Sequence, residues 1–188
     1  ILHLPVQSGS SKILNAMNRK HNIIEYCKII SDLKKVKPGI KFSSDFIIGY
    51  PGETEDDFNQ TLSLIKKIKF INSYSFIYSA RPGTPASKLN DTDSNISKKR
   101  LVKLQTLLEK NNSKSKEEFL NKTTEVLFEN KLNNEDKYFG RDKFLNSVIV
   151  QSKKNLTGKI LDIKINAYNR NSLFGKILPN EKFSLPIN

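Results

Sequence analysis

The hydrophobic periodicity changes once along the chain, and this change limits the possible folds more than any other feature. In the first half, short apolar runs alternate with segments whose apolar residues recur every three to four positions. That alternation predicts βαβ units with parallel strands and right-handed crossovers. From Thr123 onward, short apolar runs are separated by Asn, Lys and Gly. This second pattern predicts a small all-β barrel of the OB-like kind, so the fold class is α/β followed by a small barrel.

The individual elements follow from apolar runs, caps and breakers. In the first part we expect strands over 2–6, 40–50 and 71–79, and helices over 10–17, 23–36 and 55–69. A rigid loop without repetitive structure, 80–86, comes next. A long helix over 97–120 has a polar second half, which is typical of a connector. Strands are expected over 125–128, 147–151, 159–166 and 173–177. The predicted domains are 1–96, a connector helix over 97–121, and 122–188.

Charge and cysteine content narrow the class of protein. The 188 residues carry a net charge of +13. Such an excess favours a polyanionic partner such as nucleic acid, while a lysine-rich proteome bias explains it equally well. The single cysteine, Cys27, excludes an internal disulfide and a Cys-ligated zinc or iron–sulfur site within this chain. No apolar run is long enough to span a bilayer, and we expect a cytoplasmic protein with no membrane partner. The opening residues, ILHLP, lack an initial Met and look like mid-domain sequence.

The stretch DFIIGYPGETEDDF, residues 45–58, joins a predicted strand to a predicted helix. Thr54 and Asp57 have the spacing of a capping box, and the acidic residues after Thr54 suit the first turn of a helix. This interpretation argues against a phosphate site there. Gly49 either forms a tight turn or gives a ligand access to the backbone. Asp45 lies in a strand expected to be buried on both faces, so it needs a structural partner or has a role at a ligand.

Three long segments together resemble one family. These are LHLPVQSGSSKILNAMNRKH, SSDFIIGYPGETEDDF and YSFIYSARPGTPAS, and they resemble the radical S-adenosylmethionine (SAM) methylthiotransferases. The segments FGRDKFLNSVIV and NSLFGKIL resemble the TRAM domain with which these enzymes end. The resemblance covers nearly the whole chain in order, and LPVQSGS is similar to the branch that acts on tRNA.

The resemblance implies the C-terminal part of a partial (β/α) barrel followed by TRAM. It also implies SAM and two [4Fe–4S] clusters in the full-length protein. The implied reaction adds a methylthio group to C2 of N6-isopentenyladenosine next to the tRNA anticodon, so the implied partner is the anticodon stem-loop. The family's cluster cysteines have no counterpart here. We therefore expect no metal ligand and no catalytic residue in this chain, and no activity without the missing N-terminal half.

The resemblance also assigns roles to residues by position. Gln7 and Ser8 match a region facing the polar end of the cofactor. Residues expected to contact the adenosine part are Asp45, Ile47, Ile48, Gly49, Tyr78 and Ser79. Arg19 and Arg81 are loop arginines at the expected mouth, where each contacts RNA or the cofactor carboxylate, or ties down its own loop.

For the barrel we expect contacts to RNA phosphates from a basic set: Arg141, Lys143, Lys153, Lys154 and Arg170. Phe139, Phe144 and Tyr168 either stack on unpaired bases or belong to the barrel core. Two other functions stay open: the same chemistry on threonylcarbamoyl-adenosine in tRNA or on a ribosomal protein, and a non-catalytic RNA-binding module.

Overall fold

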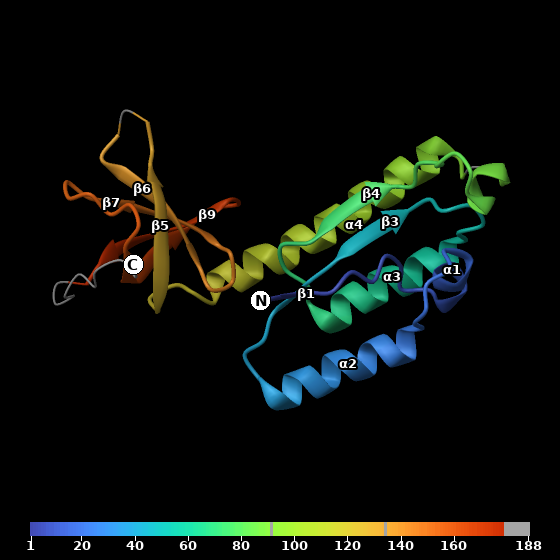
Figure 1. Ribbon diagram of the computed structural model, residues 1–188, viewed down its shortest axis with the longest axis horizontal. Helices are drawn as coiled ribbons and strands as arrows, with labels where there is room; N and C mark the ends of the chain where they lie inside the picture. The colour runs from blue at the N-terminus through green and yellow to red at the C-terminus, as the bar shows by residue number, and fades with distance from the viewer. Residues whose placement is uncertain (91, 134, 179–188) are drawn as a thin grey trace. The chain divides into compact units, whose positions relative to one another are not determined.

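The computed structural model describes residues 1–90, 92–133 and 135–178. The chain divides into two compact units, unit 1 over 1–112 and unit 2 over 113–188 (Figure 1). The last residues of the predicted 122–188 domain, 179–188, lie outside the described part. The domain boundaries at 96/97 and 121/122 stay a prediction.

Unit 1 contains short parallel strands and the helices that connect them. Its elements are β1 (Leu2–His3), α1 (Ser11–Ala16), α2 (Ile23–Val36), β2 (Phe42–Ser43), β3 (Asp45–Ile48), α3 (Glu55–Ile68), β4 (Tyr74–Ile77), the 3-10 turn η1 (Pro85–Lys88) and most of α4 (Ser94–Glu117). β1 pairs with β2 and β3 pairs with β4, both in parallel. The expected βαβ pairing is confirmed, whereas the 80–86 segment, expected to lack repetitive structure, runs into η1.

The single strand expected over 40–50 is split in two at Ser44. The Ser44 hydroxyl accepts a hydrogen bond from the Val6 amide (2.9 Å) and donates one to the Leu4 carbonyl (3.0 Å). Between them lies Pro5, which has no amide hydrogen to donate. A side chain therefore replaces one rung of the backbone ladder, and regular pairing resumes where Gln7 bridges to Phe46.

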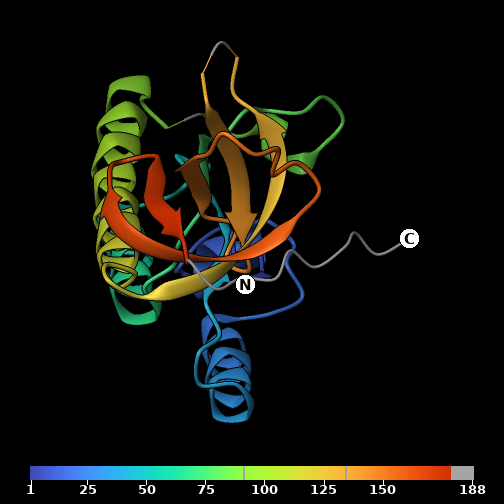
Figure 2. The same ribbon diagram turned by 90° about the vertical axis from the view of Figure 1, so that its left-hand side faces the viewer.

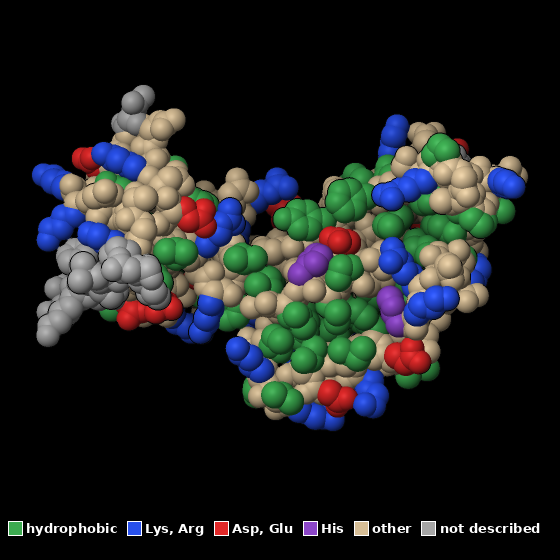
Figure 3. All heavy atoms as spheres, viewed as in Figure 1, with side chains coloured by type: hydrophobic (Ala, Val, Ile, Leu, Met, Phe, Trp, Pro, Cys, Tyr) green, Lys and Arg blue, Asp and Glu red, His purple; other side chains and the backbone are tan. Residues whose placement is uncertain are grey.

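The helices cover one face of these strands. Phe46 and Ile48 are fully buried and pack with Phe58 and Ile65 of α3. The opposite face is open: Tyr74 is 63% and Phe76 is 56% exposed. Figure 3 shows hydrophobic side chains at the surface over this part of unit 1. The expectation that these strands are buried on both faces is therefore wrong for the described part of the chain, because only one face has helices on it.

Helix α4 starts earlier than the expected residue 97. The Asp93 carboxylate accepts hydrogen bonds from the amides of Asn95 (2.8 Å) and Ile96 (3.1 Å), which caps the helix at Ser94. Leu104 is fully buried within unit 1. The polar end of the helix is not solvated all round: Lys116 is buried within unit 2 and its ammonium donates to the Arg170 carbonyl.

Unit 2 is a closed five-stranded barrel (Figure 2). Its strands are β5 (Thr123–Lys131), β6 (Lys137–Asp142), β7 (Ser147–Gln151), β8 (Ile160–Tyr168) and β9 (Ser172–Ile177), in the order β5-β6-β7-β9-β8. Alternate side chains such as Val126, Phe128, Val148 and Ile163 fill the interior. The OB-like barrel is confirmed.

One barrel strand, β6, is absent from the sequence-based prediction. Its sequence KYFGRD contains three charges and a glycine, which obscure the alternation of apolar and polar residues. Gly140 is required because a Cβ there would lie 2.5 Å from the Leu127 carbonyl oxygen on β5. The close approach of β5 and β6 therefore explains Gly140, which is one of the residues that made β6 hard to recognise in the sequence. No helix in the described ranges is long and apolar enough to cross a membrane.

Candidate functional site

The candidate site of unit 1 lies where β3 and β4 end. The Tyr78 amide donates to the Ile48 carbonyl (2.7 Å), which holds the two strand ends together. Gly49 follows with a φ of +75°, and a Cβ on it would lie 2.3 Å from the Ser97 hydroxyl of α4. Both conditions strongly favour glycine, so the tight-turn interpretation of Gly49 accounts for its position.

A cavity of about 760 Å³ opens beside these strand ends. Five of the sequence-predicted residues line it: Arg19, Ile47, Tyr78, Ser79 and Arg81. The other lining residues come from the end of α1, from β4 and from the segment 84–86, together with Tyr50. The structure thus brings together residues more than 60 positions apart in a space of the size that small-molecule sites have.

The walls of the cavity combine apolar surface with one unsatisfied polar group. Tyr50 and Tyr78 pack edge to face, with ring centroids 5.0 Å apart. The Tyr50 hydroxyl donates to the Ala16 carbonyl (2.7 Å), whereas the buried Tyr78 hydroxyl has no hydrogen-bond partner among the described residues. Ile47 and Phe76 add apolar surface. An adenosine needs apolar contact and a few hydrogen bonds, so these residues fit the adenosine part of SAM.

The remaining predicted cofactor residues lie elsewhere. Ile48 is fully buried in the helix-facing core, because neighbouring residues of a strand point to opposite faces. Ser8 is also fully buried, and its hydroxyl accepts a hydrogen bond from the Ser10 amide (3.1 Å). Gln7 has a φ of +69° and is buried, and its side-chain oxygen has no partner among the described residues. A role for these three residues and for Gly49 at the cofactor stays a prediction.

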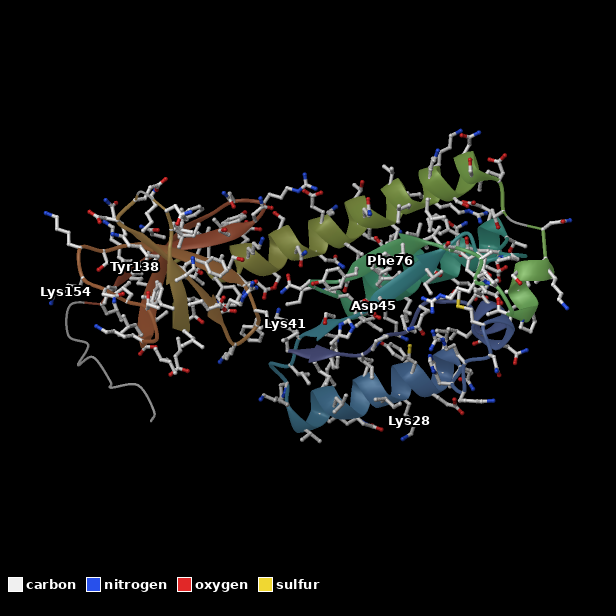
Figure 4. All side chains as sticks on the ribbon, turned by 45° about the horizontal axis from the view of Figure 1, so that its top comes forward. Lys28, Lys41, Asp45, Phe76, Tyr138 and Lys154 are labelled. Atoms are coloured by element: carbon white, nitrogen blue, oxygen red, sulfur yellow. The ribbon has the colours of Figure 1, made fainter. Side chains whose placement is uncertain are left out.

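Asp45 is not the buried carboxylate that the sequence suggested. It lies on the open face of the sheet with 33% of its side chain exposed. Its carboxylate is 3.4 Å from Nε2 of His3, whose Nδ1 is 2.8 Å from the Ser43 hydroxyl. Figure 4 shows Asp45 of β3 near Phe76 of the neighbouring strand β4. Asp45 therefore has a structural partner, and its predicted contact with the cofactor stays a prediction.

The sequence analysis missed a buried ion pair that contacts Gly49. Glu53 is inaccessible to solvent, and its carboxylate accepts hydrogen bonds from the Gly49 amide (2.9 Å) and from Arg100 of α4 (3.0 Å). Burial raises the pKa of Glu53, although the Gly49 amide and the Arg100 guanidinium oppose that rise. Arg100 also binds Glu55 (3.1 Å). The sequence did offer one sign. Glu53 precedes the helix cap at Thr54, so it is not one of the acidic residues in the first turn of the helix.

The expected capping box is confirmed, and Asp57 does more than cap. Its carboxylate accepts hydrogen bonds from the Thr54 amide (2.9 Å), from the Ser10 hydroxyl (2.7 Å) and from the Lys12 ammonium (2.7 Å). Burial on its own would raise the pKa of Asp57, but these donors outweigh it and hold the pKa below its usual range. Asp57 therefore anchors the segment before α1 to the start of α3.

Replacing Asp57 by asparagine is expected to lower the free energy of unfolding by about 1–3 kcal/mol at pH 7, because buried donors lose a charged acceptor. A carboxylate whose folded pKa is depressed stabilises the fold above its unfolded pKa of about 4, and this contribution fades as the pH falls below that value. The difference between wild type and Asp57→Asn should therefore shrink towards pH 3. Urea unfolding followed by circular dichroism at both pH values measures it.

Asp56→Asn is the matched control, because Asp56 is an exposed neighbour whose carboxylate accepts a hydrogen bond from the Gln60 side chain (2.7 Å). It should change stability by less than about 0.5 kcal/mol. A loss in Asp57→Asn that is the same at pH 3 and pH 7 would contradict the role assigned to its charge.

The predicted RNA-binding residues of unit 2 lie on strand β6 and in three connecting segments. Arg141 lies on the outer face of β6, 3.0 Å from Glu129, with its guanidinium 5.2 Å from the centre of the Phe139 ring. Lys143 lies in the β6–β7 loop, Lys153 and Lys154 (Figure 4) in the β7–β8 loop, and Arg170 in the β8–β9 turn. The five residues come from four different segments of unit 2, and their contacts with RNA stay a prediction.

The aromatic candidates have different environments. Tyr168 packs against the barrel core. Phe144 packs edge to face against Phe119, with ring centroids 5.7 Å apart. Phe139 lies half-buried on the outer face of β6. Of the three, Phe139 is on the face of the barrel that points away from its core.

Two family models match the chain. Residues 1–65 match the radical SAM superfamily, and residues 117–178 match the TRAM domain. The chain therefore contains part of a radical SAM domain, followed by a TRAM domain.

Within the radical SAM superfamily, curated relatives confirm the resemblance to the methylthiotransferases. The chain is 50% identical over 182 residues to tRNA-2-methylthio-N(6)-dimethylallyladenosine synthase of Pelagibacter ubique (strain HTCC1062), which covers 97% of this chain and 41% of the relative. It is 45% identical over 178 residues to the synthase of the same name from Ruthia magnifica subsp. Calyptogena magnifica, with 94% and 40% covered. The chain thus spans about two fifths of the length of these relatives.

Proposed function

We propose that this chain is part of a radical SAM methylthiotransferase that adds a methylthio group to C2 of N6-isopentenyladenosine next to the anticodon of tRNA. The observation that carries the proposal is the cavity at the ends of β3 and β4, lined by Ile47 and Tyr78, in a chain 50% identical to a tRNA-2-methylthio-N(6)-dimethylallyladenosine synthase. In this proposal unit 1 holds the cofactor and unit 2 holds the tRNA.

SAM and iron–sulfur clusters, when bound in the full-length protein, supply the radical chemistry of the superfamily. We assign the adenosine part of SAM to the cavity, where Ile47 gives apolar contact and the free Tyr78 hydroxyl gives a hydrogen bond. The described residues contain no group of three His, Cys, Asp or Glu that could hold a metal ion. Since the chain also has a single cysteine, we place the cluster ligands in the rest of the parent protein.

Nucleoside analysis tests the reaction. Deleting the parent gene should remove the methylthio derivative of N6-isopentenyladenosine from cellular tRNA and leave N6-isopentenyladenosine itself. Mass spectrometry of digested tRNA measures both. Unchanged tRNA would contradict the proposal, and loss of a threonylcarbamoyl-adenosine derivative instead would assign the other tRNA substrate.

Replacing Tyr78 by phenylalanine in the full-length protein tests the cavity. We expect about a tenfold weaker affinity for SAM, because the variant loses one hydrogen bond worth about 1 kcal/mol or slightly more. Stability should not fall, because the hydroxyl is buried without a partner among the described residues. Isothermal titration of the cluster-loaded protein with SAM measures the change.

Tyr74→Phe is the matched control, since Tyr74 is a 63% exposed tyrosine on β4, the strand that ends directly before Tyr78, and it does not line the cavity. It should bind SAM as the wild type does. Equal affinities in Tyr78→Phe and wild type would remove Tyr78 from the site.

A further inference from the structure

Three side chains from neighbouring strands form a row on the outside of the barrel. Phe139 of β6 is in register with Ile149 of β7, which is in register with Phe174 of β9. Their strand neighbours, such as Val148 and Leu173, are fully buried in the barrel core. Because successive side chains of a strand alternate between faces, the row points outward. All three residues are partly accessible to solvent.

A groove of about 540 Å³ runs along part of this row. Ile149 and Phe174 form an apolar floor, and Ile177 extends it. The rim is polar and comes from four exposed side chains: Lys137, Gln151, Asn166 and Lys176. An aromatic ring on the floor and amides and ammonium groups on the rim are the elements of a site for a single nucleotide.

The charged residues that line the groove, Lys137 and Lys176, are both cationic. Lys176 is in register with Lys164 of β8, so a second lysine lies next to this rim residue. The acidic residue of β6, Asp142, points inward and is buried, where it binds Asn146. Lys137 contacts Glu135 (2.5 Å), an exposed ion pair of the kind that contributes little and exchanges readily.

The outer face of β5 is different in charge. There the exposed positions Glu125 and Glu129 are acidic and flank Leu127, which is 46% exposed. Leu127 thus lies beside two carboxylates and beside Arg141, which pairs with Glu129, whereas the charged residues lining the groove are lysines. The groove is therefore the more complementary of the two surfaces to a polyanion.

We propose that this groove binds one unpaired base of single-stranded RNA. The base stacks on Phe174, the amides of Gln151 and Asn166 face its edge, and Lys137 and Lys176 contact the flanking phosphates. The inference rests on the proposed tRNA-binding role of unit 2 and adds a site to it. Stacking requires a base released from a duplex, so the ligand is a loop or a single strand.

The chain contains no tryptophan, which permits a direct test. Phe174→Trp keeps a stacking ring and introduces the single fluorophore of its kind. Titrating this variant of the 188-residue chain with a ten-nucleotide oligouridylate should quench the tryptophan emission. Leu127→Trp, on the acidic face, should show no saturable quenching by the same RNA.

Affinity provides a second measurement. Phe174→Ala should bind the oligouridylate about tenfold more weakly than wild type, as expected for one stacked base, and Phe174→Trp should restore the affinity. Leu127→Ala should bind as wild type does. Fluorescence anisotropy of labelled RNA measures the wild type and these three variants, and circular dichroism confirms that each is folded.

The outcomes separate this site from the proposed function. If wild type binds tRNA but Phe174→Trp is not quenched, the site is wrong and the function stands. Equal quenching by duplex RNA or by a polyglutamate peptide would also overturn base stacking. If wild type binds neither tRNA nor the oligonucleotide, the RNA-binding role of unit 2 fails and the site fails with it.

Discussion

Replacing Arg100 by methionine is expected to lower the free energy of unfolding by about 3–5 kcal/mol. The Arg100 side chain is 8% exposed and its partner Glu53 is not exposed at all. Without the guanidinium, the Glu53 carboxylate keeps a hydrogen bond from the Gly49 amide but has lost its buried counter-charge. Urea unfolding of the chain, followed by circular dichroism, measures the loss.

The pH dependence of this variant has a definite sign. Burial raises the pKa of Glu53, and removing Arg100 removes one of the groups that oppose the rise. An acid whose folded pKa lies above its unfolded value destabilises the fold increasingly as the pH rises between those two values. Arg100→Met should therefore lose less stability at pH 4 than at pH 7.

Two further variants make the result specific. Lys99→Met removes an exposed cation from the same helix and should cost less than about 0.5 kcal/mol. The double variant Glu53→Gln with Arg100→Met should be less destabilised than the sum of the single variants, because the two side chains interact directly. Additive losses would show that the pair is not coupled.

Replacing Gly9 by alanine should destabilise the chain by about 3 kcal/mol, the upper part of the range for overpacking. The added Cβ would lie 2.4 Å from Cα and 2.7 Å from the amide nitrogen of Thr61, and these are backbone atoms of α3 that cannot rotate away. The Gly9 amide also donates to the Thr61 hydroxyl (2.8 Å), a bond that the displaced loop would lose. Urea unfolding again provides the measurement.

Gly39→Ala is the control for this prediction. A Cβ on Gly39 would meet no atom within 4 Å, and its φ is not positive. The substitution should therefore leave stability within about 0.5 kcal/mol of wild type. If Gly9→Ala and Gly39→Ala are equally stable, the segment before α1 is not packed against α3 as described.

Local signals in the sequence predicted most of the secondary structure. The helix expected over 23–36 is observed with those bounds, and the helix after Thr54 starts at its predicted cap. The prediction failed where a distant residue changes the local pattern. Ser44 interrupts its strand because it bonds across to residues 4 and 6, and β6 was missed because Gly140 accommodates a neighbouring strand.

The candidate site was predicted in part. Ile47 and Tyr78 line the cavity, whereas Ile48 lies in the core. The sequence placed both isoleucines at the strand end but did not indicate which face the helices cover.

From the sequence alone we could predict the order of the elements apart from β6, the helix cap at Thr54, the change from α/β to barrel and the resemblance to the methylthiotransferases. These depend on periodicity, on hydrogen bonds within a few residues and on contiguous motifs. The tertiary structure alone decided that Arg100 pairs with Glu53, 47 positions away, and that Phe139, Ile149 and Phe174 lie in one row. Such pairs are set by strand register and helix packing, which bring together side chains whose local sequence carries no sign of the partner.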